Sequence, residues 1–127
     1  MLAETILIVD DNETNLKLAR VLLQVSGYAV RTAADAEDAQ RQLAAFTPAL
    51  ILMDIQLPGM DGLELTRRLK ADAATKDVVI LALTASAMKG DEEKARAAGC
   101  DGYIAKPIDI DTLPTMVAEH LKARRSR

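Results

Sequence analysis

The stretch LILMDIQLPGMDG, residues 50–62, decides the predicted fold. Its first four residues are apolar without alternation, which is typical of a strand covered on both faces. The proline and glycines that follow indicate a loop, and Asp61 with Glu64 forms an Asp-x-x-Glu capping pair. A helix to about Ala71 is expected after this pair. A buried strand that stops at Asp54, followed by a loop and a helix, is the unit from which α/β folds are built.

Strand-like and helix-like segments alternate in the same way along the rest of the chain. The predicted strands are Thr5–Val9, Tyr28–Ala33, Leu50–Met53, Val78–Leu83 and Tyr103–Ala105. The first predicted helix is Glu13–Ser26. The second is capped by Asp35, ends at Thr47-Pro48 and buries Ala36, Ala39, Leu43 and Phe46. The helix from Asp61 is the third, Met88–Ala98 is the fourth, and the last begins at Asp111 with Pro114 in its first turn. We therefore predict one three-layer α/β domain over residues 1–127, a parallel sheet with helices on both faces.

Composition excludes several classes of protein. The net charge of −3 over 127 residues disfavours a nucleic-acid binder, which needs a basic surface. No apolar run approaches the ~18 residues of a membrane span, and the N-terminus lacks the basic and apolar regions of a signal peptide. The single cysteine, Cys100, cannot form an internal disulfide, and we expect it to be a packed residue. These features predict a cytoplasmic protein without membrane insertion.

Polar residues stand where four of the predicted strands stop: Asp10 and Asp11, then Asp54, then Thr84, then Lys106. The carboxyl ends of parallel strands share one edge of the sheet, so these side chains are expected to lie together. Three converging carboxylates repel one another unless a cation lies between them. Mg²⁺ suits such a site because it takes a few carboxylates and keeps several waters, and Mn²⁺ could replace it.

This set of side chains fits phosphoryl transfer. An aspartate oxygen can attack phosphorus and carry an acyl phosphate. Charge then spreads over the phosphoryl oxygens, which need positive charge and hydrogen-bond donors around them. The ammonium of Lys106 and the hydroxyl of Thr84 can supply these.

Four motifs in order resemble the receiver domain of two-component response regulators over nearly the whole chain. They are Ile-Val-Asp-Asp-Asn at 8–12, Leu-Met-Asp-Ile-Gln-Leu-Pro-Gly-Met-Asp-Gly at 52–62, Leu-Thr-Ala at 83–85 and Lys-Pro at 106–107. The resemblance implies the flavodoxin-like (βα)5 fold with strand order 2-1-3-4-5. It also implies that Asp54 is the phosphoacceptor and that Asp10 and Asp11 help to hold Mg²⁺.

Further roles follow from the same resemblance. The backbone carbonyl of Gln56 would be the third protein ligand of the metal. Thr84 and Tyr103 would form a switch pair, the threonine moving toward the phosphoryl group and the ring turning inward. Lys106 would bind the phosphoryl group, and its bond to Pro107 would be cis.

The chain encodes no output domain, so a signal is expected to leave by protein contact. In receivers the fourth helix, fifth strand and last helix form the signalling face. The stretches at 11–15, 87–93 and 99–100 are most similar to single-domain cell-cycle regulators of the DivK type. The implied partners are a histidine kinase, a histidine phosphotransfer protein or both. A receiver from a hybrid histidine kinase is the alternative.

Two other classes share part of the pattern. A flavodoxin-like cofactor binder needs a phosphate loop after the first strand, where this chain has two carboxylates. A magnesium-dependent phosphohydrolase carries its aspartyl nucleophile on the first strand and needs a cap, for which 127 residues leave no room. Self-phosphorylation and self-dephosphorylation are expected, without an external substrate. His120, in the last helix, is expected to be a boundary residue and not a phosphohistidine.

Overall fold

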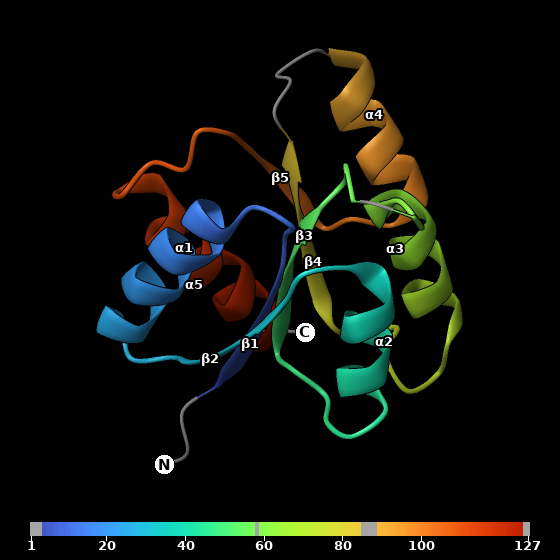
Figure 1. Ribbon diagram of the computed structural model, residues 1–127, viewed down its shortest axis with the longest axis horizontal. Helices are drawn as coiled ribbons and strands as arrows, with labels where there is room; N and C mark the ends of the chain where they lie inside the picture. Colours follow the sequence, from blue (N-terminus) through green and yellow to red (C-terminus); the bar gives the residue numbers. More distant parts are fainter. Residues whose placement is uncertain (1–3, 58, 85–88, 126–127) are drawn as a thin grey trace.

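The computed structural model describes residues 4–57, 59–84 and 89–125, in which helices follow strands in strict alternation (Figure 1). The strands are β1 (Thr5–Val9), β2 (Ala29–Ala33), β3 (Leu50–Asp54), β4 (Val79–Thr84) and β5 (Gly102–Ala105). The helices are α1 (Glu13–Val25), α2 (Ala36–Leu43), α3 (Gly62–Ala71), α4 (Lys89–Ala98) and α5 (Thr112–Arg125).

The strands form one parallel sheet in the order β2-β1-β3-β4-β5, which confirms the predicted α/β fold. The register aligns the ends of the strands. Val9 lies opposite Met53, and Asp54 lies opposite Leu83. Asp10 and Asp11 follow β1, Asp54 and Thr84 end β3 and β4, and Lys106 follows β5. These residues therefore lie at one edge of the sheet.

Helices cover both faces of this sheet: α1 and α5 lie on one side, and α2, α3 and α4 on the other (Figure 1). The side chains of β3 alternate between the two layers. Ile51 and Met53 belong to the apolar cluster under α2–α4, while Leu50 and Leu52 belong to the cluster under α1 and α5. All four are fully buried. Burial on both faces explains why the apolar run in this strand shows no alternation.

Side-chain caps begin four of the helices. The carboxylates of Asp35 and Asp61 accept the backbone N–H groups of Asp38 and Glu64, as predicted for α2 and α3. For α5, the side chain of Asp109 accepts the N–H groups of residues 111 and 112, so the cap lies before the predicted start. The fourth cap, on α1, is Asn12.

The prediction that α2 extends to Thr47-Pro48 was wrong. The helix ends at Leu43, and the carbonyl of Gln42 accepts N–H groups from both Ala45 and Phe46 in a tightened last turn. Phe46 lies beyond the helix, half-buried against the α2–α4 layer. The guanidinium of Arg31 covers its ring at 4.5 Å, so a tertiary contact and not helical spacing places this side chain.

The sequence predicts that the fourth helix buries little besides alanines. In the structure, Ala95 and Ala98 of α4 are buried. Met88, its predicted first residue, lies outside the described residues. In α5 the predicted stripe is buried at Leu113, Val117 and Leu121. No helix in the described ranges combines the length and the apolar character needed to cross a membrane.

Candidate functional site

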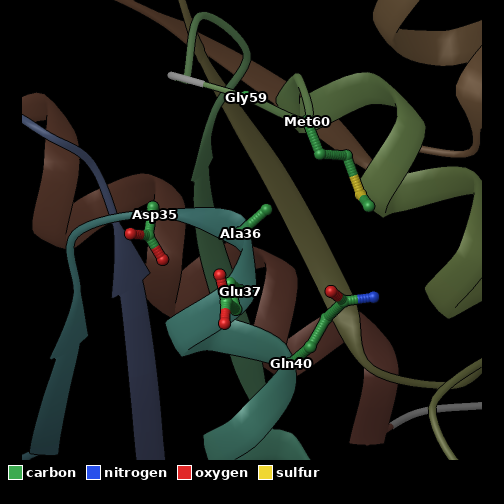
Figure 2. Close-up of a pocket in the computed structure, with 6 residues that line it drawn as sticks. All are labelled: Asp35, Ala36, Glu37, Gln40, Gly59 and Met60. Atoms are coloured by element: carbon green, nitrogen blue, oxygen red, sulfur yellow. The ribbon is translucent and has the colours of Figure 1, made fainter.

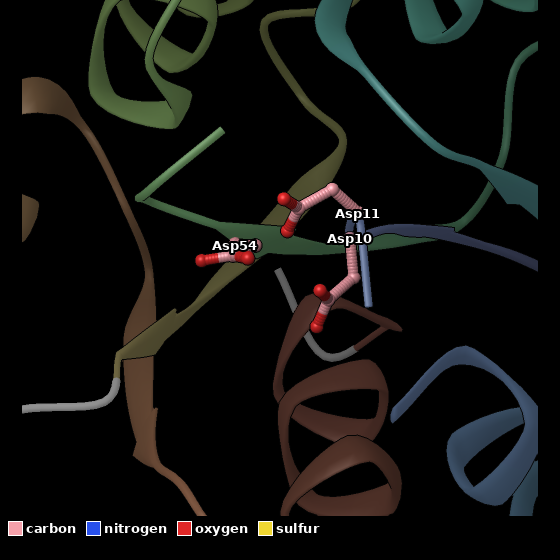
Figure 3. Close-up of side chains that lie close together, drawn as sticks. All are labelled: Asp10, Asp11 and Asp54. Carbon is pink, nitrogen blue, oxygen red and sulfur yellow. The ribbon is translucent and has the colours of Figure 1, made fainter. Parts of the chain in front are cut away.

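Three carboxylates meet where β1 and β3 end (Figure 3). Asp10, Asp11 and Asp54 each offer an oxygen atom, and these oxygens all lie within 4.8 Å of one another. Asp10 is 0% exposed and Asp54 is 3% exposed, whereas Asp11 faces solvent. The sequence prediction that these three residues lie together is confirmed. Two of the three carboxylates are therefore buried, and the third is accessible to solvent.

Lys106 supplies the positive charge. Its Nζ atom lies 3.2 Å from Oδ2 of Asp54 and 3.2 Å from Oδ2 of Asp10. Burial by itself lowers the pKa of this ammonium, but the two carboxylates outweigh burial and hold the pKa above the usual 10.5. The main chain also fixes the lysine, because its N–H donates to the carbonyl of Thr84 at 2.7 Å. The peptide bond to Pro107 is cis, as expected.

The pKa of Asp54 is raised above its usual 3.8, chiefly because burial disfavours the charged form. The N–H of Gln56, which donates to Oδ1 at 2.9 Å, opposes this effect. The charge of Asp10 raises the pKa further, and that of Lys106 lowers it. The balance leaves a carboxyl group that gains from any additional positive charge.

The donor set fits a divalent cation. Oδ1 of Asp10 accepts the N–H of Asn12 at 2.9 Å, but Oδ2 is buried and has no hydrogen-bond partner among the described residues. The ammonium of Lys106 is close enough to Oδ2 for an ion pair, yet its geometry is not that of a hydrogen bond. One lysine also leaves three carboxylates undercompensated. A hard cation with oxygen ligands would satisfy both the orphaned oxygen and the excess charge.

Thr84 and Tyr103 lie on the same face of the sheet. Thr84 is buried at the end of β4, and Tyr103 is half-buried at the register position opposite Ala82. Because Ala82 and Thr84 are two residues apart, both project toward the layer under α2–α4. Tyr103 packs against that layer. Gln56 is exposed just past Asp54.

Asn12, which organises the acidic loop, was not predicted as a site residue. Its N–H donates to Asp10, while its side chain accepts the N–H of Asn15 and begins α1. The high preference of asparagine for helix caps was the available signal. The two residues expected to be structural agree with that interpretation. Cys100 is buried, which raises the pKa of its thiol, and His120 is only half-buried.

A hollow of about 480 Å³ lies between the N-terminus of α2 and the loop after β3 (Figure 2). Its lining residues are Asp35, Ala36, Glu37, Gln40, Gly59 and Met60. None of the three clustered aspartates lines it. The candidate chemistry therefore lies at the sheet edge and not in this hollow.

Residues 6–118 match the sequence model of the response regulator receiver domain. The chain belongs to this family. Membership of this family sets aside the alternatives of a flavodoxin-like cofactor binder and a phosphohydrolase.

Similar receiver proteins cover nearly the whole chain. It is 43% identical over 123 residues to the polar-differentiation response regulator DivK of Brucella ovis, covering 94% of this chain and 98% of that protein. A receiver domain protein of Methanospirillum hungatei, described as CheY-like, matches in structure with a TM-score of 0.90, 29% identity and 98% coverage of both chains. The chemotaxis response regulator CheY4 of Vibrio cholerae matches with a TM-score of 0.88 and 27% identity, over 93% of this chain and 98% of that one.

Proposed function

We propose that this receiver domain accepts a phosphoryl group on Asp54 and signals through phosphorylation-dependent protein contacts. The observation that carries the proposal is the position of Asp54. Its carboxylate is buried at the carboxyl end of the central strand, 3.2 Å from the ammonium of Lys106 and within the acidic cluster. Family membership supports the same role for an aspartate at this place.

We further propose that the cluster binds Mg²⁺, for which Mn²⁺ can substitute. Asp10, Asp11 and Asp54 would contribute carboxylate oxygens, and Gln56 its backbone carbonyl. The uncompensated charge and the orphaned oxygen of Asp10 support this ligand set. When bound, the ion would neutralise charge on the carboxylates and on the phosphoryl oxygens.

In the proposed reaction, a carboxylate oxygen of Asp54 attacks the phosphorus of a phosphohistidine or of a small acyl phosphate. A new O–P bond forms while the P–N or P–O bond to the donor breaks, and the donor leaves with that bond's electron pair. Lys106 would pair with one phosphoryl oxygen and Thr84 would donate its hydroxyl hydrogen to another. Water would later hydrolyse the acyl phosphate, and no external substrate is expected.

The phosphoryl donor would be a histidine kinase or a histidine phosphotransfer protein. Thr84 and Tyr103 would couple the phosphoryl group to the surface made by α4, β5 and α5, where a downstream protein would bind. Similarity to DivK favours a cell-cycle or developmental role and a cytoplasmic location. A receiver that belongs to a hybrid histidine kinase would use the same residues.

Intact-mass measurement after incubation with acetyl phosphate tests the chemistry. We expect wild type to gain one phosphoryl group in the presence of Mg²⁺ and none in EDTA. Asp54→Asn should gain none under either condition. Asp35→Asn is the matched control, because asparagine caps a helix as well as aspartate does, and it should behave like wild type. An adduct that survives in Asp54→Asn would refute the assignment of the acceptor.

A further inference from the structure

Gly62, the first residue of α3, lies against the backbone at the end of β3, the strand that carries Asp54. A Cβ atom added at Gly62 would lie 2.1 Å from the carbonyl oxygen of Asp54 and 2.8 Å from Cα of Ile55. The φ angle of Gly62 is not positive, so its conformation is open to any residue. What excludes a side chain here is space, and the excluding atoms belong to the backbone.

The backbone that Gly62 approaches runs from Asp54, the proposed phosphoacceptor, to Gln56. Ile55 is held from both sides: its N–H donates to the carbonyl of Leu83 at 3.2 Å, and its carbonyl accepts the N–H of Gly62 at 3.3 Å. The next N–H, that of Gln56, donates to the carboxylate of Asp54 at 2.9 Å. A shift of the Ile55 peptide would therefore move Asp54 and Gln56 together.

The helix on the other side of this contact is also anchored. Leu65 and Thr66 are fully buried one turn into α3, and the hydroxyl of Thr66 donates to the carbonyl of Gly62 at 2.8 Å. A methyl group at position 62 would thus press between two fixed parts. Real Cβ atoms essentially never approach closer than 3.0 Å, so relieving the 2.1 Å contact needs a movement of about 1 Å.

We infer that Gly62 is a positioning residue for the phosphoacceptor: its missing side chain lets the first turn of α3 hold the Ile55 peptide, and with it the carboxylate of Asp54 and the carbonyl of Gln56, in place. The inference rests on the proposed function, because it assigns Gly62 a role in that same site. It differs from a capping or turn role, since neither would depend on the space between Gly62 and Asp54.

Gly62→Ala is the test, measured in two ways. Calorimetric titration of the unphosphorylated protein with Mg²⁺ alone should show affinity reduced about 10-fold or more, the effect typical of residues that orient metal ligands. At saturating Mg²⁺, the initial rate of phosphorylation by acetyl phosphate should fall by up to about 100-fold, because a misplacement near 1 Å has that cost.

Two control variants separate positioning from loss of stability. Gly90→Ala adds the same methyl group where no atom of the described residues lies within 4 Å, and should leave both measurements at the wild-type value. Leu69→Ala opens a cavity in α3 without adding atoms near Asp54. It should lower the urea midpoint while Mg²⁺ affinity stays within about twofold of wild type.

Equal Mg²⁺ affinity in Gly62→Ala and wild type would overturn the inference, as would an equal loss in Leu69→Ala. Failure of wild type itself to gain a phosphoryl group would instead refute the proposed function. If Gly62→Ala does not fold in plain buffer, both measurements are made on wild type and all variants in a stabilising osmolyte such as sucrose. The same outcomes then support or overturn the inference.

Discussion

The ammonium of Lys106 lies 3.2 Å from a carboxylate oxygen of Asp54, although 52 residues separate the two in the chain. The same ammonium lies 3.2 Å from Asp10. One cation thus serves two buried carboxylates at the end of the sheet. This relationship makes the stability of the domain, its affinity for divalent cations and its proposed chemistry depend on one another.

Replacing Lys106 should expose this dependence. Without divalent cations, Lys106→Met should lose roughly 3 kcal/mol of unfolding free energy, because it leaves buried carboxylates without their partner. Addition of Mg²⁺ should restore most of the loss. Urea denaturation in EDTA and in Mg²⁺ measures both effects, and Lys17→Met, at an exposed site of α1, is the control. Equal stability of Lys106→Met and wild type in EDTA would contradict the prediction.

The raised pKa of Asp54 predicts a pH dependence of stability. The folded protein binds this proton more readily than the unfolded chain. The contribution of Asp54 to stability is therefore complete below the usual pKa of 3.8 and is lost as pH rises through the raised value.

We expect this contribution to appear as a difference between wild type and Asp54→Asn. In EDTA, Asp54→Asn should be the more stable protein at neutral pH, and its advantage should shrink as pH falls through the raised pKa. Mg²⁺ affinity of wild type should weaken over the same window, because the proton competes with the cation. Urea midpoints and calorimetry across a pH series measure both. A pH-independent difference between the two proteins would refute this account.

A second ion pair, far from the acidic cluster in the fold, should matter for stability alone. Nζ of Lys70 lies 2.9 Å from Asp101 and 2.7 Å from the carbonyl of Val78, and the same Asp101 oxygen accepts the N–H of Ile80. This contact joins the end of α3 to the starts of β4 and β5.

Lys70→Met should therefore destabilise the domain by about 2 kcal/mol, because the hydrogen bonds of the ammonium are lost and a partly buried carboxylate is left with less compensation. Arg68→Met is the matched control. It removes an exposed pair with Glu64 on the same helix, which should cost less than about 0.5 kcal/mol. Urea denaturation compares the two. A similar loss in both variants, or a change in Mg²⁺ affinity in Lys70→Met, would argue against a purely structural role.

The proposed switch can be followed through its aromatic ring. The chain has two tyrosines, and they pack in opposite layers, Tyr103 under α2–α4 and Tyr28 under α1 and α5. On phosphorylation, the ring resonances of Tyr103 should shift in wild type and stay unshifted in Thr84→Ala, which lacks the hydroxyl that would draw β4 toward the phosphoryl group. Tyr28 is the internal reference. A Tyr103 shift of equal size in phosphorylated Thr84→Ala would remove Thr84 from the switch.

Local patterns in the sequence were enough to predict the order of the elements and the residues at the strand ends. Runs such as Leu50–Met53 predict buried strands because both faces of the sheet must be apolar, and Asp61 begins a helix through contacts within one turn. Parallel pairing then brings Asp10, Asp11 and Asp54 to one edge whatever the details of packing. These parts of the site needed no knowledge of distant contacts.

Tertiary structure alone decided the contacts between distant segments. Lys70 and Asp101 are 31 residues apart, and nothing local indicates that they pair. The end of α2 depends on where Phe46 packs, and the space beside Gly62 depends on how α3 meets β3. Such contacts are set by the shape of the assembled core, which no single segment encodes. The sequence by itself determined which groups the domain places at its sheet edge, and the packing of the helices decided how closely those groups are held.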